Sequence, residues 1–176
     1  MSSAGVGPMW WTRRSEYRCA VTPWSARVGS PRFPEIRLLL PGDYREGFTS
    51  KDEALDRYLR LYAGQNQFRH RIGVNYVAIM EGRVTGYASV SPANIEFERL
   101  PPTLAKRLPR YPLPVLRLAR LATDRRVRGQ GVGLELLRYV FGLAHQMSGE
   151  FGCVGVLVDA KAPAVAFYGV PSFSVQ

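Results

Sequence analysis

The residues with the clearest chemical potential form one glycine-rich loop between an apolar run and a helical pattern. The loop consists of Arg128, Gly129, Gln130, Gly131, Val132 and Gly133. A helix start carries unpaired N–H groups and the positive end of the helix dipole, and glycines let that backbone approach a ligand without Cβ clashes. Phosphate or pyrophosphate is the usual ligand of such a site. The alternative is a glycine-rich turn that binds nothing.

The spacing of the glycines excludes two common nucleotide-binding motifs. No Lys-Ser or Lys-Thr pair follows them, as a P-loop requires, and the third glycine comes one residue too early for the dinucleotide fingerprint G-x-G-x-x-G. The pattern that remains is Arg128-x-x-Gly131-x-Gly133, directly after a predicted strand and before a predicted helix.

The segments on either side of the loop predict a crossover. Residues 115–122 form an apolar run of strand length, and residues 153–158 form a continuous apolar run, as expected of a buried strand. The intervening helix has one apolar face, made of Leu137, Val140, Phe141, Ala144 and Met147. A strand, a helix and a parallel strand make a right-handed crossover, so a ligand at the helix start would lie at the carboxyl ends of the strands.

A helical region precedes the crossover. Ser50 and Glu53 have the spacing of a capping box, which predicts a helix start. Apolar residues then recur at i, i+3, i+4 and i+7, namely Leu55, Tyr58, Leu59 and Tyr62. A second short helical piece is predicted over residues 65–71. This region supplies the helices for one face of a sheet.

Three further strands complete the expected fold. Residues 36–41 form a candidate first strand, and residues 74–80 and 84–91 alternate around a Glu81-Gly82 turn, which predicts a hairpin. Together these elements predict an α/β (α+β) fold with a mixed, mostly antiparallel sheet and helices on both faces.

The composition indicates a soluble, basic globular protein. The chain has 176 residues and a net charge of +10, and its mean hydropathy is −0.13. No apolar run is long enough to span a membrane. The charge favours a polyanionic partner, mainly nucleic acid, or an acidic membrane surface, and a solvated arginine-rich surface is the alternative. The two cysteines and two histidines have no metal-ligand spacing, so we expect no metal and a reducing, cytoplasmic location.

The first 34 residues differ from the rest of the chain. They hold all three tryptophans, many Arg, Ser and Pro residues and a single acid, Glu16. No apolar core of about 7–15 residues follows a basic start, so the segment is no secretory signal. We expect a poorly ordered leader over residues 1–34 and one domain over residues 35–176.

The order of the elements resembles that of the GNAT family of N-acetyltransferases. The motif Arg128-x-x-Gly131-x-Gly133 resembles the loop with which this family binds the pyrophosphate of acyl-CoA. Three stretches resemble one subfamily, the acetyltransferase toxins of bacterial toxin–antitoxin systems. They are residues 63–67, residues 118–124, and Val158-Asp-Ala160 followed by Ala164-x-x-Phe167-Tyr168. The resemblance covers about residues 36–173.

Two features depart from the subfamily pattern. Phe48-Thr-Ser-Lys51 stands where a Phe-x-Cys-Gly element is usual, and the chain stops at Gln176. A strand takes about five or six residues, so we expect the last strand of the fold to be missing. That would expose an edge of the sheet and puts activity in doubt.

The resemblance implies acetyl-CoA as co-substrate. The loop backbone from Arg128 to Gly133 would hold the pyrophosphate, and N–H groups of the central strand at Leu121, Ala122 and Thr123 would face the thioester carbonyl. Tyr168 matches the tyrosine that the family uses to protonate the departing thiolate. The alternative for Tyr168 is a core aromatic beside Phe167.

No general base stands out in the sequence. Asp159 is a candidate, but a carboxylate after a strand more often caps the next helix. An α-amino group, with a pKa of about 7.7–8.0, is neutral in roughly a tenth or more of molecules at pH 7, whereas a lysine amine is almost fully protonated. A site without a base therefore suits an α-amino substrate.

The partners implied by the resemblance are aminoacyl-tRNA, whose acetylation stops translation, and a ribbon-helix-helix antitoxin; a homodimer is also allowed. The candidate tRNA contacts are Lys106, Arg107, Arg110, Arg117, Arg120, Arg69, His70 and Arg71. Two alternative functions stay open: an acetyltransferase for a small amine or a protein N-terminus, and a remnant that has lost catalysis.

Overall fold

The computed structural model describes residues 8–9, 33–100 and 105–158. Within these residues, six strands form one sheet in the order β1-β6-β5-β4-β3-β2. The strands β5 and β6 are parallel and all other neighbours are antiparallel, which confirms the mixed, mostly antiparallel sheet. The strands are β1 Pro8–Met9, β2 Glu35–Leu38, β3 Val74–Met80, β4 Arg83–Ile95, β5 Leu113–Thr123 and β6 Val156–Val158.

Some expectations fall on residues that the structure does not describe. They are the final strand, the candidate base Asp159, the stretch Ala164-x-x-Phe167-Tyr168 and the leader, apart from the two residues of β1 that pair with β6. The expected domain boundary therefore stays a prediction.

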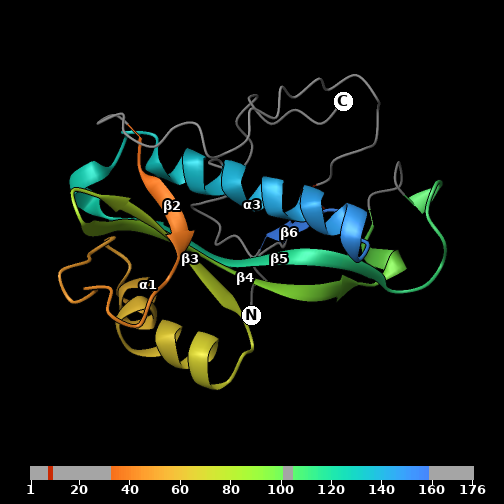
Figure 1. Cartoon of the computed structure of the whole chain (residues 1–176). Helices are drawn as coiled ribbons and strands as arrows, with labels where there is room; N and C mark the ends of the chain where they lie inside the picture. Colours follow the sequence, from red (N-terminus) through yellow and green to blue (C-terminus); the bar gives the residue numbers. More distant parts are fainter. Residues whose placement is uncertain (1–7, 10–32, 101–104, 159–176) are drawn as a thin grey trace, which may run out of the picture.

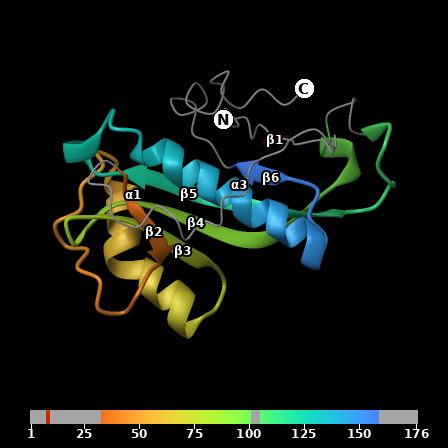
Figure 2. The same ribbon diagram turned by 45° about the horizontal axis from the view of Figure 1, so that its top comes forward.

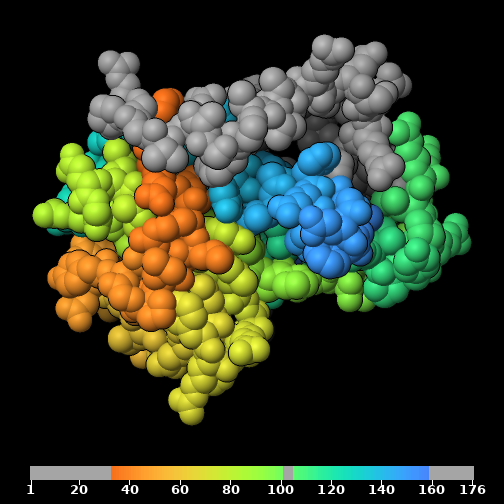
Figure 3. Space-filling model, in the orientation of Figure 1, coloured from red at the N-terminus to blue at the C-terminus, as the bar shows by residue number. Residues whose placement is uncertain are grey.

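Helices cover both faces of the sheet, as predicted. The 19-residue helix α3 Val132–Glu150 lies on one face. The other face carries α1 Glu53–Arg57, η2 Tyr58–Tyr62 and η3 Gln65–Arg69, which follow one another with only residues 63–64 between η2 and η3 (Figure 1; Figure 2). The space-filling view shows this second helical region as a lobe projecting from the rest of the surface (Figure 3). Two short 3-10 turns, η4 Phe97–Arg99 and η5 Arg125–Val127, follow strands β4 and β5.

A hydrophobic core lies on each side of the sheet. The core under α3 joins apolar residues of β2 to β6 with the buried face of the helix, made of Val132, Leu136, Leu137, Val140 and Ala144. Three of the five predicted face residues are buried, whereas Phe141 and Met147 are partly buried at the edge of this core. The second core packs Tyr58, Leu59 and Ala63 against the opposite face.

Two helix predictions were wrong in detail. The cap of α1 is Asp52, whose carboxylate accepts hydrogen bonds from Ala54 and Leu55 N–H at 3.0 and 3.2 Å. Ser50 instead donates its hydroxyl to the buried Asp56 carboxylate at 2.6 Å. The i+7 residue, Tyr62, is 40% exposed. The two π-helical turns cause this, because an i→i+5 turn rotates the buried face of the helix by about one residue, from Tyr62 to Ala63.

Candidate functional site

Asp124 anchors the start of the glycine loop. Its side chain is 1% exposed and accepts hydrogen bonds from Arg126 Nε and Nη2 at 2.9 and 2.7 Å. It also accepts the backbone N–H groups of Arg126 and Thr49 at 2.9 and 3.2 Å. The Arg126 guanidinium and these N–H donors lower the pKa of the Asp124 carboxyl group, so it is ionised at neutral pH. The turn from Asp124 to the loop is therefore held by hydrogen bonds.

The segment around Thr49 braces this turn from outside. Arg125 N–H donates to Thr49 O at 2.8 Å, and Arg126 Nη2 donates to Gly47 O at 2.9 Å. Phe48 is buried, with its ring edge-on to Tyr87 at 5.8 Å between centroids. Sequence reasoning missed this contact because 75 positions separate Thr49 from Asp124. The only feature of the sequence that pointed to this segment was Phe48, an apolar residue directly before the first predicted helix.

The glycine loop has the backbone that an anion site requires. Gly129 and Gly131 have φ angles of +81° and +83°, in the left-handed region that favours glycine. Among the described residues, no atom lies within 4 Å of a Cβ placed on either residue, so within this part of the chain the space above both is open. Gly131 is the N-cap of α3, and no side chain caps the helix. The first helical bond runs from Glu135 N–H to Gly131 O, which leaves the preceding N–H groups for a ligand.

The backbone N–H groups of Arg128 and Gln130 are bonded within the protein and are not available to a ligand. Arg128 N–H donates to Arg125 O at 3.4 Å and Gln130 N–H donates to Val127 O at 3.1 Å. These two N–H groups close the η5 turn. If Arg128 and Gln130 contact a ligand, they do so through their side chains, whereas Val132 and Gly133 can offer backbone N–H groups.

At its end beside the loop, β5 has no neighbouring strand opposite β4 among the described residues, and we call this side its open edge. Its pairing with β6 ends, in the described residues, at Leu118 opposite Val158. Beyond this point β5 pairs, within the same residues, only with β4, after a bulge at Ala119, which pairs with no residue of β4. Asp124 N–H donates to Thr85 O in β4, and backbone direction alternates along a strand. The N–H groups of Leu121 and Thr123 therefore face the open edge, whereas that of Ala122 faces β4.

Gly86 on β4 lets the start of α3 approach the sheet. A Cβ on Gly86 would lie 2.9 Å from Leu136 Cδ1, 3.1 Å from Val132 Cγ1 and 3.2 Å from Ala122 O. Only a residue without a side chain fits this contact. Sequence reasoning did not single out Gly86, although an isolated glycine within a strand pattern can signal close backbone approach.

A buried polar network joins the helical lobe to β3 and β4, on the face of the sheet opposite α3. The Tyr58 hydroxyl makes hydrogen bonds with Ser89 Oγ at 3.0 Å and Asn75 Oδ1 at 3.3 Å. Asn75, with no exposed surface, donates to Ala63 O and to Gln67 Oε1. Gln67 in turn donates to Leu39 O at 3.0 Å. This network explains Gln67 of the 63–67 stretch, whose side chain ties the helical lobe to the sheet.

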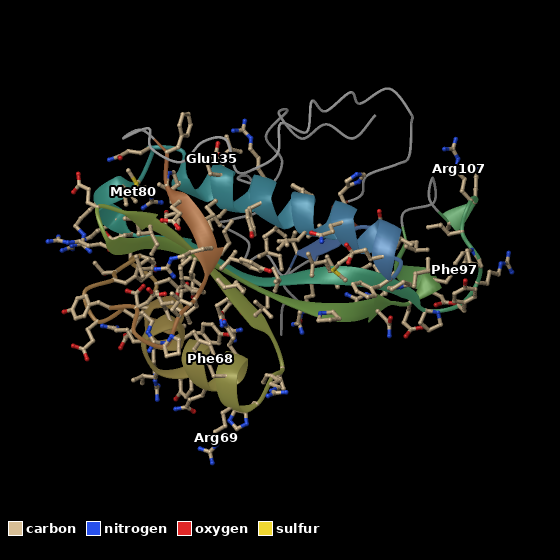
Figure 4. All side chains as sticks on the ribbon, viewed as in Figure 1. Phe68, Arg69, Met80, Phe97, Arg107 and Glu135 are labelled. Carbon is tan, nitrogen blue, oxygen red and sulfur yellow. The ribbon has the colours of Figure 1, made fainter. Side chains whose placement is uncertain are left out.

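The structure brings nine of the ten predicted site residues together. Leu121, Ala122 and Thr123 end β5, and the loop Arg128–Gly133 leads into α3 immediately afterwards. The tenth residue, Tyr168, lies outside the described residues. The predicted tRNA contacts do not form one patch, since Arg69 and Arg107 lie at distant ends of the molecule (Figure 4).

Two further observations bear on the class of site. Within the described residues, no group of three or more His, Cys, Asp and Glu side chains could hold a metal ion, and no helix there is long and apolar enough to cross a membrane. Cys153 is buried, and its thiol donates to Gly155 O at 3.2 Å, as a small buried residue does.

Comparison with known proteins agrees with this geometry. Residues 33–169 match the model of the Acetyltransferase (GNAT) family. The chain is 32% identical over 133 residues to a tRNA-acetylating toxin of Mycobacterium tuberculosis (strain ATCC 25618 / H37Rv), which covers 75% of this chain and 79% of the toxin.

Solved structures show the same similarity. AtaT complexed with acetyl-methionyl-tRNAfMet superposes with a TM-score of 0.71 at 26% identity, over 76% of this chain and 82% of that chain. A point mutant of KacT has a TM-score of 0.71 at 28% identity, over 77% and 84% of the two chains. AtaTR bound with AcCoA has a TM-score of 0.66 at 27% identity, over 77% and 83%. The chain belongs to the GNAT acetyltransferase family and is an acetyltransferase that uses acetyl-CoA.

Proposed function

We propose that this chain transfers the acetyl group of acetyl-CoA to the α-amino group of aminoacyl-tRNA and acts as a translation-blocking toxin. The observation that carries the proposal is the open edge of β5 beside the uncapped start of α3. Similarity to a tRNA-acetylating toxin supports the choice of substrate.

The described residues fit acetyl-CoA at this place. The open space above Gly129 and Gly131 and the N–H groups at the start of α3 suit a pyrophosphate. The Arg128 and Gln130 side chains, both exposed, would add contacts from the rim of the loop. Asp124 would hold the loop in this conformation through its bonds to Arg126 and Thr49.

The open edge of β5 supplies hydrogen-bond donors for the thioester end of acetyl-CoA. When bound, acetyl-CoA supplies an acetyl group activated as a thioester. The N–H groups of Leu121 and Thr123 would donate to the acetyl carbonyl oxygen, where negative charge develops during acyl transfer. Ala122 would keep the strand in register through its pairing with Tyr87. Tyr168 would donate a proton to the departing thiolate.

The state of the nearest buried carboxylate supports an α-amino acceptor. Asp124 is occupied by Arg126 and Thr49 and its pKa is lowered, so it makes a poor base for the acceptor amine. An α-amino group, with a pKa of about 7.7–8.0, reaches its neutral form near pH 7 without a base, whereas a lysine amine does not.

The partners of the relatives suggest partners for this chain. AtaT has been captured with an acetylated methionyl-tRNA, and a mutant of AtaT is bound to the C-terminus of its antitoxin AtaR. For this chain we infer an aminoacyl-tRNA substrate, consistent with the net charge of +10. A ribbon-helix-helix antitoxin, a cytoplasmic location and a homodimer are parts of the same proposal.

The proposal is tested with radiolabelled acetyl-CoA and a pool of total tRNA charged with amino acids. The wild type should place label in the tRNA fraction, and Tyr168→Phe should slow this transfer strongly. Transfer to small amines or protein N-termini without label in tRNA would favour the first alternative function. No transfer to any acceptor would indicate a remnant that has lost catalysis.

A further inference from the structure

Arg120 lies on β5 two residues beyond Leu118, the last residue that pairs with β6 in the described part of the chain. It follows the bulged Ala119, and its partner on β4 is Ser89. The neighbouring residue, Leu121, directs its N–H group to the open edge that is proposed to receive the acetyl carbonyl. The Arg120 side chain lies on the opposite face from α3, because its guanidinium stacks on the ring of Tyr58 in η2. Arg120 is thus close to the proposed reacting centre, on the side away from α3.

The ring under Arg120 is a rigid platform. The guanidinium carbon lies 3.8 Å from the centre of the Tyr58 ring, a close cation–π contact. Tyr58 is only 6% exposed, and its hydroxyl is bonded to Ser89 and Asn75. It opens the first of two π-helical turns, which occur frequently at functional sites. A guanidinium held in this way loses little further freedom when it binds a ligand.

The N–H donors of this guanidinium have no acceptor among the described residues. Arg120 is half-buried, yet within the described residues it forms no ion pair and no side-chain hydrogen bond. A guanidinium carries five N–H donors in a planar fork. Arg126, which follows β5, differs because its guanidinium is bound to the Asp124 carboxylate. The unused, pre-positioned donors of Arg120 are suited to an oxygen of the acceptor.

We propose that Arg120 binds the acyl carbonyl oxygen of an α-aminoacyl ester and thereby selects α-amino groups as acceptors. This inference rests on the proposed function and names the group of the substrate that is recognised. In an α-aminoacyl ester the carbonyl carbon is attached to the carbon that bears the nucleophilic amine. A donor beside the reacting centre therefore reaches that oxygen, whereas a lysine side chain or a simple amine has no carbonyl at this position.

The test compares two acceptors in the full chain. One is the amino acid methyl ester that the wild type uses best, and the other is the amine that lacks its ester group. Arg120→Met should lower kcat/KM for the ester roughly 10- to 100-fold, as expected for the loss of a hydrogen bond to a charged donor. The same variant should change kcat/KM for the simple amine by less than about twofold. Arg120→Lys, which keeps the charge, should recover part of the activity on the ester.

A matched control is Arg57→Met. Arg57 also stacks on a tyrosine, Tyr62, at 5.8 Å, but on the exposed side of the helical lobe. The Arg57→Met variant should leave the ratio of kcat/KM for the ester to kcat/KM for the amine unchanged. An equal loss on both acceptors in Arg120→Met would mean a purely structural role and would overturn the inference. So would a wild type that shows no preference for the ester.

The result also separates this inference from the proposed function. A wild type that acetylates amino acid esters but not charged tRNA would refute the tRNA substrate, and the comparison of ester with amine would still decide the role of Arg120. Label in charged tRNA together with an unchanged ratio in Arg120→Met would refute the role of Arg120 alone. A wild type that is inactive on every acceptor contradicts both.

Discussion

Gly86→Ala tests whether the close packing of α3 on β4 positions the proposed acetyl-CoA site. The added methyl group would lie 2.9 Å from Leu136 Cδ1 and 3.1 Å from Val132 Cγ1, whereas ordinary contacts begin at 3.4 Å. The first contact alone requires a displacement of about 0.5 Å. Leu136 is fully buried and Val132 is 2% exposed, so neither side chain can turn outward. We therefore expect the start of α3 to move away from the sheet.

The expected loss of stability follows from the cost of overpacking. Extra methyl groups in a well-packed core cost about 1–3 kcal/mol. A loss of about 2 kcal/mol in the free energy of unfolding would lower Tm by roughly 4–8 °C in a chain of this size. Because Val132 opens α3, the N–H groups proposed to hold the pyrophosphate move with it. We expect the Kd for acetyl-CoA to rise about tenfold, or roughly 1.4 kcal/mol.

Thermal unfolding and calorimetric titration with acetyl-CoA measure the two effects. The matched control is Gly142→Ala in α3, where no atom lies within 4 Å of the added Cβ. That variant should gain about 0.5–1 kcal/mol of stability, since glycine is unfavourable within a helix. Adding Leu136→Val to Gly86→Ala should cost less than the sum of the two single changes, because it removes the clashing atom. Wild-type stability and affinity in Gly86→Ala would refute the packing argument.

Three further changes probe other parts of the site. Asp124→Asn should lose about 2 kcal/mol at pH 7. Because the pKa of Asp124 is lowered on folding, its contribution is present above its unfolded pKa of about 3.9 and is lost as pH falls through the folded pKa. Urea unfolding should then show wild type and variant converging in acid, and a constant difference down to pH 2 would contradict this. Gly131→Ala should lower the free energy of unfolding by about 1–2 kcal/mol, because it places a side chain at φ +83°. It should also weaken acetyl-CoA binding in calorimetry. Unchanged affinity would exclude the loop as the pyrophosphate site. Tyr58→Phe should cost about 1–3 kcal/mol in urea unfolding by leaving buried polar atoms unpaired, whereas Tyr62→Phe should cost little, and equal effects would contradict the network.

Local patterns predicted most elements of the fold. Strand β3 has the predicted bounds, and Glu81 and Gly82 have the positive φ angles, +50° and +71°, that a tight hairpin turn requires. The crossover from β5 through α3 to a parallel β6 is also confirmed. Periodicity and turn residues are properties of neighbouring positions, so they can be found in the sequence.

Contacts between distant segments could not be predicted in the same way. The hydrogen bond between Thr49 N–H and Asp124 depends on how two loops far apart in the sequence meet in space. The bulge at Ala119 and the packing at Gly86 depend on the register between β4 and β5 and on the position of α3. The π-helical turns place Ala63 rather than Tyr62 in the core. A helical period of 3.6 residues does not predict this change of face.

The most direct test of the central claim is the chemical position of the transferred acetyl group. Charged tRNA incubated with the protein and labelled acetyl-CoA is digested with nuclease, and the terminal nucleoside is identified by mass spectrometry. The account predicts N-acetyl-aminoacyl-adenosine in the wild type and much less of it in Gly131→Ala and Tyr168→Phe. Acetyl groups found only on lysine side chains or on the nucleobases, with the α-amine unmodified, would contradict it.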